Sequence, residues 1–220
     1  MTSEMIDNSL PNPNQRAIRF WDKMANRYTK KPVADEQTYQ RKLEISRSYF
    51  QPNMSNVLEI GCGSGSTAIS HAPYVQHIHA TDISTRMIEI AKLKAQQQSV
   101  DNITFEQVST EDISYPNDSQ DAVLALSVLH LLSDKEALVE KVYNMLKPNG
   151  VFITSTPCIA DMSSLLGTIL PIANFLRVIP PLSIFNLSEL ENCLTRSGFT
   201  IEKQWLPGPK ASVFIVARKP

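Results

Sequence analysis

The chain has 220 residues, of which 42% are hydrophobic and 20% charged, so it can bury the core of one domain of ordinary size. Its 21 basic and 22 acidic residues leave a formal net charge of −1, which excludes the basic field that non-specific binding to nucleic acid or to an anionic membrane requires. The composition favours a small-molecule partner and no nucleic acid.

The cysteines and the apolar stretches predict a reducing, cytoplasmic location. Cys62, Cys158 and Cys193 are odd in number and widely spaced, so they form neither a disulfide framework nor a zinc-ligand pair. The N-terminal residues carry no apolar run of the length that a secretory signal requires. The apolar region near residues 165–185 is broken by prolines, so we expect no stable membrane insertion.

The first 50 residues predict a helical addition to the main domain. Residues 16–28 and 35–50 have amphipathic helical patterns, and Pro32 divides them. We interpret residues 1–50 as a leader and a helical lid within the same domain, followed by the main domain at residues 51–220.

Strand-like and helical stretches alternate after Pro52. Five strand-like runs occupy residues 56–60, 77–81, 103–107, 122–126 and 151–155, and a stretch long enough for a helix separates each from the next. This alternation predicts a parallel sheet with crossover helices, a doubly wound α/β fold. Residues 200–206 and 211–218, joined by a Pro-Gly-Pro turn, predict an antiparallel strand pair at one side of the sheet.

Terminal signals mark the later helices. Ser133 with Glu136 predicts a capping box, and the sequence KPNG at residues 147–150 predicts the end of that helix. Asn186 with Glu189 predicts a second capping box, with Gly198 ending the last helix.

A glycine-rich turn, VLEIGCGSG at residues 57–65, follows the first strand. Gly61, Gly63 and Gly65 are three of only seven glycines in the chain. In an alternating α/β chain such a turn brings backbone amides and a helix N-terminus against a ligand, typically a nucleotide cofactor. A plain tight turn is the alternative, because a glycine pattern alone is a weak signal.

Glu59 and Ser66 discriminate between cofactors. Ser66 stands where the dinucleotide pattern has its third glycine, which argues against NAD. A carboxylate at Glu59 would repel a pyrophosphate but attract a ligand with an ammonium and a sulfonium, and S-adenosylmethionine has both.

Acidic residues also follow the next two strands. Asp82 lies 21 positions after Gly61, where a carboxylate accepts hydrogen bonds from a ribose diol; helix capping is its alternative role. After the third strand, Glu111 or Asp112 could accept from an adenine amino group while the amide of Ile113 donates to the ring. A solvated acidic loop is the alternative there.

These residues resemble the class I S-adenosylmethionine-dependent methyltransferases, in particular the type 11-like group that modifies small molecules. The resemblance rests on VLEIGCGSG, on ATDIS with Met87 following, on STEDISYPNDSQDAVLALSVLHLL and on LKPNGVFITSTP. It implies a Rossmann-like fold with seven strands, S-adenosyl-L-methionine as cofactor and S-adenosyl-L-homocysteine as product. It also implies a substrate-lid insertion at about residues 158–185.

The resemblance further implies roles for individual residues. The glycines would line the methionine part, with Glu59 on its ammonium side, and Asp82 would bind the ribose. Ile83 and Met87 would enclose the adenine, whose amino group Asp112 would bind. Ser127 and Val128 would contact the methionyl end, and Tyr28 would close over the cofactor. Tyr28 and Trp21 could instead form only the apolar face of the first helix.

His130 is the candidate general base. The methyl group is already activated by the positive sulfur, so the protein mainly aligns the nucleophile and a base is optional. His130 follows the fourth strand and could take a proton from a hydroxyl, phenol or acidic carbon; a packing role is the alternative. His77 and His79 lack a third ligand at a useful spacing, so we expect no metal site.

The apolar segment at residues 163–185 lies where this family builds its substrate pocket. Leu170, Phe175 and Arg177 are its candidate substrate-binding residues, with packing or an interface as the alternative. We therefore expect a hydrophobic or aromatic acceptor and a chain that is a monomer or a homodimer. The competing hypotheses are a non-catalytic S-adenosylmethionine-binding partner protein and an NAD-dependent oxidoreductase.

Overall fold

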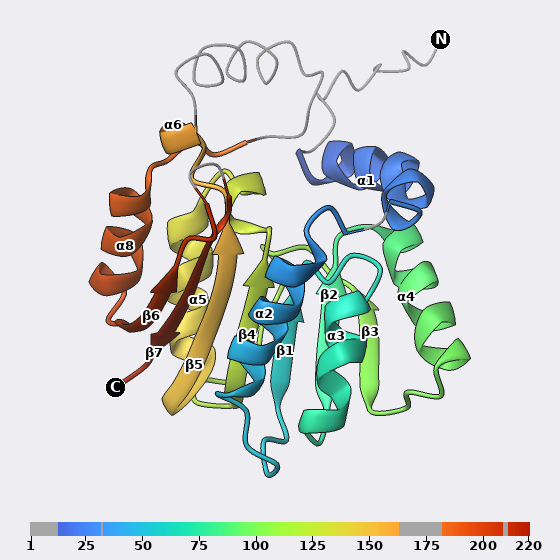
Figure 1. Ribbon diagram of the computed structural model, residues 1–220, viewed down its shortest axis with the longest axis horizontal. Helices are drawn as coiled ribbons and strands as arrows, with labels where there is room; N and C mark the ends of the chain where they lie inside the picture. Colours follow the sequence, from blue (N-terminus) through green and yellow to red (C-terminus); the bar gives the residue numbers. More distant parts are fainter. Residues whose placement is uncertain (1–12, 32, 163–181, 209–210) are drawn as a thin grey trace, which may run out of the picture.

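A seven-stranded sheet forms the centre of the computed structural model, which describes residues 13–31, 33–162, 182–208 and 211–220 (Figure 1). The strand order is β3-β2-β1-β4-β5-β7-β6, and only β7 runs against its neighbours. The strands are β1 (Val57–Ile60), β2 (Ile78–Asp82), β3 (Ile103–Gln107), β4 (Gln120–Leu126), β5 (Leu146–Thr156), β6 (Thr200–Trp205) and β7 (Val213–Arg218). The predicted doubly wound α/β fold with an antiparallel C-terminal pair is confirmed.

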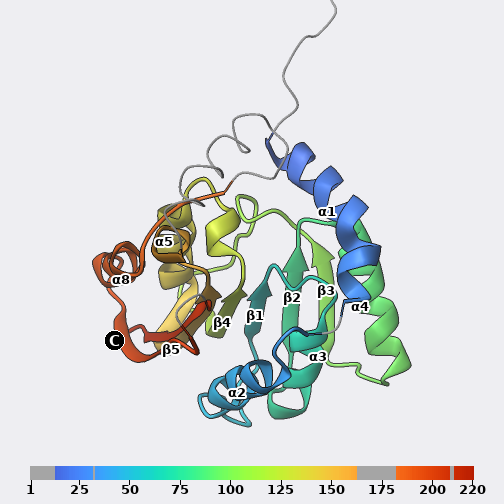
Figure 2. The ribbon, with the colours of Figure 1, turned by 45° about the horizontal axis from the view of Figure 1, so that its top comes forward.

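Helices cover both faces of the sheet. One face packs on α2 (Glu36–Arg47), α3 (Ser66–His71) and α4 (Thr85–Gln97), and the other on α5 (Lys135–Met145) and α8 (Leu187–Arg196). Helix α1 (Pro13–Thr29) lies at the carboxyl ends of the strands, beside the start of α4 (Figure 2). In the described part of the chain the other short helices are η1 (Ala72–Tyr74), η2 (Leu129–Leu131) and α6 (Ile159–Met162).

The apolar pattern of β1 explains its central position. All four of its residues are buried. Leu58 and Ile60 belong to the core cluster shared with α5 and α8, whereas Val57 belongs to the cluster shared with α3 and α4. A parallel strand covered on both faces needs this continuous run instead of alternation. The carboxyl end of β1 therefore delivers the glycine turn to the middle of the sheet edge.

Two expectations about the connections are wrong. No helix joins β3 to β4; residues 108–119 form turns, with Asp118 at φ 53°, because the Tyr115–Pro116 sequence disfavours a helix there. The predicted Ser133–Glu136 capping box is absent, because Asp134 caps α5 by accepting from the amide of Ala137. Helix α5 ends at Met145, and KPNG lies within β5.

The other terminal signals are confirmed. Asn186 and Glu189 form the complete capping box of α8, and Gly198, at φ 100°, follows its end. Ser84 caps α4 through its side chain, which accepts from the amide of Met87. Within the described ranges, no helix has both the length and the apolar character needed to span a bilayer.

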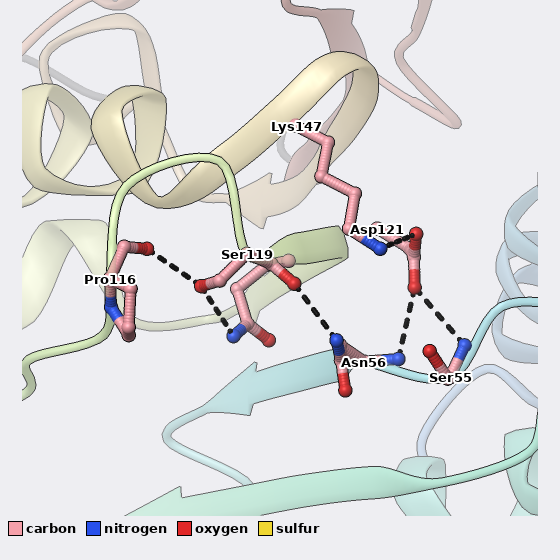
Figure 3. Close-up of polar contacts among 7 residues, drawn as sticks. Ser55, Asn56, Pro116, Ser119, Asp121 and Lys147 are labelled. Carbon is pink, nitrogen blue, oxygen red and sulfur yellow. Dashed lines mark hydrogen bonds and ion pairs between the residues drawn. The ribbon is translucent and has the colours of Figure 1, made fainter.

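A polar cluster fixes the strands at the edge opposite the glycine turn (Figure 3). One carboxylate oxygen of Asp121 accepts from the amides of Ser55 and Asn56, each at 3.0 Å, and the other meets Lys147 Nζ at 2.6 Å. The side chain of Asn56 donates to the carbonyl of Ser119 at 3.0 Å. These contacts join the starts of β1, β4 and β5, so they hold the register that aligns the other ends of the strands.

Candidate functional site

The glycine turn leaves β1 in a backbone conformation that favours glycine. Gly61, Gly63 and Gly65 have φ values of 68°, 53° and 73°. A Cβ at Gly61 would lie 2.3 Å from Val128, and one at Gly65 would lie 2.9 Å from Phe105. At Gly63 a Cβ would meet nothing within 4 Å. Gly61 and Gly65 therefore allow close packing, while Gly63 leaves open space that a ligand can approach.

Asp82 is held rigidly at the end of β2. Its two carboxylate oxygens accept from the amides of Gly63 and Ser84, each at 2.8 Å. Each oxygen keeps a free lone pair, so two further hydroxyl donors can be accepted. Burial raises the pKa of Asp82 despite these hydrogen bonds, and the nearby Asp22 adds to the effect. Asp82 binds the turn and faces the space beside it.

A cavity of about 170 Å³ lies beside the turn. Its lining includes these predicted cofactor-binding residues: Tyr28, Gly61, Gly63, Asp82, Ile83, Met87, Glu111, Ser127 and Val128. The rest of the lining was not predicted as cofactor-binding: Asn14, Ala17, Trp21, Ile60, Val108, Thr110, Leu126, Leu131, Leu132 and Ser133. The structure thus brings together residues from α1, from the turn and from the ends of β2 and β4.

Four predicted residues lie outside the lining. Gly65 packs against α4 and β3. Asp112 accepts from the hydroxyl of Ser109 at 2.6 Å, and Ile113 is buried in the core. Glu59 is the fourth, with only 3% of its surface exposed. Of the two acids after β3, Glu111 is the one that reaches the cavity.

Burial favours the neutral form of the Glu59 carboxyl group. Burial, with a smaller contribution from the charge of Asp82, raises the pKa of Glu59 to about 8. A neutral Glu59 would repel a pyrophosphate less than the ionised carboxylate expected from the sequence. An arriving cation would favour the ionised form, because opposite charge lowers the pKa of a carboxyl group.

The comparisons with known proteins extend over part of the chain. A family model described as "Methyltransferase domain" matches residues 57–150. The uncharacterized methyltransferase YcgJ of Bacillus subtilis (strain 168) is 37% identical over 97 residues, which are 44% of this chain and 38% of that protein. A ubiquinone biosynthesis O-methyltransferase of Xanthomonas axonopodis pv. citri (strain 306) is 28% identical over 116 residues, 52% of this chain and 48% of that protein.

The solved structures share the fold over most of the chain. The crystal structure of YcgJ from Bacillus subtilis has a TM-score of 0.65 at 21% identity, covering 81% of this chain and 96% of that one. The [4+2]-cyclase SpnF has a TM-score of 0.76 at 18% identity, covering 96% and 97%. The family match coincides with the turn, Asp82 and the strands that carry the cavity.

Residues 57–150 are similar to the methyltransferase-domain family, and the chain shares the fold of an S-adenosylmethionine-dependent methyltransferase from Mesorhizobium loti, with a TM-score of 0.66 at 19% identity, covering 80% of this chain and 96% of that one. The aligned region spans less than half the length of both curated relatives. The comparisons therefore give the fold of the chain and the domain family that residues 57–150 match.

His130 lies next to the cavity without lining it. Its Nδ1 lies 3.3 Å from the hydroxyl of Thr156, and its neighbours Leu131 and Leu132 form part of the wall. Burial lowers the pKa of His130 to about 4, so the ring is neutral at neutral pH. A neutral imidazole is the form that a general base requires.

Lys42 is a polar residue near the site that sequence reasoning missed. Its Nζ donates to the hydroxyl of Ser155 at 2.8 Å, and the carbonyl of Ser155 accepts from the amide of Ser127 at 2.6 Å. Ser127, at φ 63°, lines the cavity. Burial lowers the pKa of Lys42. No sequence signal separates Lys42 from the other basic residues of α2, Arg41 and Arg47, because its approach to β5 is a tertiary contact.

Helix α1 supplies one wall of the cavity. Trp21 and Tyr28 both line it, with their ring centroids 6.3 Å apart in an edge-to-face arrangement. Tyr28 remains 53% exposed. The amphipathic pattern of residues 16–28 predicted the helix, but it did not predict that the face with Trp21 and Tyr28 lines a cavity.

A groove between α5 and α8, and the pair His77 and His79, lie outside the cavity beside the glycine turn. A groove of about 780 Å³ runs between α5 and α8 and contains none of the predicted site residues. His77 contacts Thr104, and His79 contacts Tyr115 and Glu106. Among the described residues no cluster could hold a metal ion. Leu170, Phe175 and Arg177 lie outside the described residues.

Proposed function

We propose that this chain binds S-adenosyl-L-methionine beside the glycine turn and transfers its methyl group to a small acceptor with a hydrophobic or aromatic body. The observation that carries the proposal is the arrangement of Gly63 and Asp82. The open side of Gly63 and the two free lone pairs of Asp82 face one cavity, and the Gly63 amide fixes the carboxylate. A ribose diol matches this pair of acceptors.

The remaining polar groups fit the two charges of the methionyl end. Glu59 would ionise opposite the ammonium group, as its raised pKa allows. Lys42, beside Ser155 and Ser127, supplies a positive charge suited to the carboxylate. At the other end, Ile83 and Met87 would enclose the adenine, and Glu111 and Asp112 remain the candidates for its amino group.

When bound, the cofactor supplies an electrophilic methyl group attached to a positively charged sulfur. Once the methyl group is transferred, that sulfur is part of a neutral thioether. The chain aligns the acceptor and excludes water, which can contribute about 7–11 kcal/mol through proximity and orientation. His130 would accept the proton that an acceptor hydroxyl loses. Its lowered pKa makes it a weak base, so it would assist only while the proton is being transferred.

The apolar part of the cavity supports a hydrophobic acceptor. Leu126, Leu131 and Leu132 lie on the side of the cavity formed by β4 and η2. The Xanthomonas relative is named for ubiquinone biosynthesis, which is consistent with an aromatic or quinone-type acceptor. We also propose a cytoplasmic location, because the three cysteines are free and buried, as in a reducing compartment.

A second candidate is S-adenosylmethionine binding without methyl transfer. A [4+2]-cyclase shares the fold over 96% of this chain, so the fold is compatible with other chemistry. A screen of phenols, quinols and amines with methyl-labelled cofactor distinguishes the two. Label in an acceptor supports transfer, whereas tight cofactor binding without label in any acceptor supports the second candidate.

The general-base assignment predicts a selective kinetic effect. In His130→Ala, turnover should fall by about 10²–10⁴-fold. Affinity for S-adenosylhomocysteine should stay near the wild-type value, because His130 does not line the cavity. Full turnover in the variant would mean that the enzyme works by alignment alone.

A further inference from the structure

Helix α1 is joined to the start of α4 through one carboxylate, that of Asp22. Its Oδ1 accepts from the hydroxyl of Ser84 at 2.6 Å and from the amide of Arg86 at 3.1 Å. Asp22 lies next to Trp21, which lines the cavity. The connection therefore reaches from the cavity wall to the helix that follows Asp82.

Ser84 connects Asp22 to two groups at the cavity. Ser84 is fully buried, and its single hydroxyl hydrogen is donated to Asp22, while its oxygen accepts from the amide of Met87 at 3.1 Å. The amide of Ser84 donates to Asp82 at 2.8 Å. Met87 and Asp82 both line the cavity. One serine thus ties together the lid, a wall residue and the carboxylate that faces the ligand.

The geometry at the other end of α1 indicates that the helix bridges the cavity. Asn14 donates to Glu111 at 3.3 Å, and both residues belong to the lining. Asp22, near the middle of α1, is half-buried and attaches the helix to the start of α4. Ser84 joins the two carboxylates, since its hydroxyl donates to Asp22 and its amide donates to Asp82.

We propose that Asp22 is a positioning residue that holds α1 closed over the adenosine end of the cofactor and orients Ser84 and Asp82. This inference rests on the proposed function. Asp22 touches no ligand; it acts by fixing Ser84 and the aromatic wall of α1. A purely structural role, a second cap for α4, would change stability without changing how long the ligand stays bound.

Trp21 provides a direct optical readout. The chain has two tryptophans, and Trp205, in β6 on the far side of the sheet, is replaced in a Trp205→Phe background. The emission of Trp21 then reports binding and release of S-adenosylhomocysteine. Asp22→Ala should accelerate dissociation by about tenfold or more, as expected for losing hydrogen bonds to a charged group.

Matched variants separate positioning from stability. Lys23→Ala, an exposed change on the same helix, and Asn186→Ala, the loss of the α8 cap, should leave dissociation within about twofold of the background. Ser84→Ala should resemble Asp22→Ala, and the double variant should add little, because both changes remove one shared contact.

The rate of ligand dissociation decides the inference. Dissociation unchanged in Asp22→Ala, or fully additive effects with Ser84→Ala, would overturn it. If Asp22→Ala does not fold, Ser84→Ala, which removes the hydroxyl that Asp22 holds, decides; faster release in that variant supports the inference and unchanged release contradicts it. A parent protein that does not bind S-adenosylhomocysteine at all would contradict the proposed function instead.

Discussion

In the proposed site, Asp82 is the residue that would accept the ribose hydroxyls. Asp82→Ala removes two potential acceptors for a ribose diol and the partner of the Gly63 amide. We expect affinity for S-adenosylhomocysteine to fall by about 1.5–3 kcal/mol, the range for hydrogen bonds to a charged group. Calorimetric titration measures the loss, and Asp101→Ala, an exposed loop change, is the control. Unchanged affinity in Asp82→Ala would remove the ribose assignment.

The proposed role of Glu59 predicts that cofactor binding depends on pH. Its pKa is about 8 in the structure and ordinarily 4.5, so the folded chain holds a proton that the unfolded chain releases. The contribution of this proton to the free energy of unfolding is fully present below pH 4.5 and is lost as the pH rises through 8. Binding an ammonium group favours the carboxylate, so binding should release the proton.

The affinity for S-adenosylhomocysteine should therefore rise with pH up to about 8 and then level off. Titrations in buffers of different ionisation enthalpy measure the released proton directly. Glu59→Gln, which stays neutral, should bind more weakly and lose this part of the pH dependence. An identical slope in Glu59→Gln would show that another group titrates.

At the scale of elements, the cluster around Asp121 determines how β1, β4 and β5 are aligned (Figure 3). Asp121→Ala leaves two backbone amides and Lys147 without their carboxylate. We expect the free energy of unfolding to fall by about 1.5–3 kcal/mol, because the lost hydrogen bonds involve a charged group. Chemical denaturation measures the loss. Cofactor affinity should be retained below the melting transition, since the cluster lies at the opposite edge of the sheet.

The elements themselves were largely predictable, because their signals are local. The apolar runs of β1 and β4 and the Asn186–Glu189 box occur within a few residues of the structure they produce. The β3 to β4 connection was not predictable from its length alone, since twelve residues can form a helix or turns and Pro116 decides for turns. Asp134 rather than Ser133 caps α5. The sequence could not distinguish these neighbours, because serine and aspartate are both favoured at the N-cap position.

At the scale of the whole molecule, the site combines local and long-range contributions. The turn and Asp82 were predictable because they follow strands whose carboxyl ends meet at one edge. The roles of Lys42 and Trp21 depend on how α1 and α2 pack against distant strands, which no single segment records. The neutrality of Glu59 depends on burial, so only the folded environment reveals it.

Calorimetric titration of S-adenosylhomocysteine into the wild-type chain and into Gly63→Val tests the central claim most directly. Valine at φ 53° would be strained, and its branched side chain would fill the open space beside the turn. We predict one bound ligand per wild-type chain, no binding of NADH, and no binding by a folded Gly63→Val variant. Absent binding by the wild type, or equal affinity in the folded variant, would contradict a cofactor site at the glycine turn.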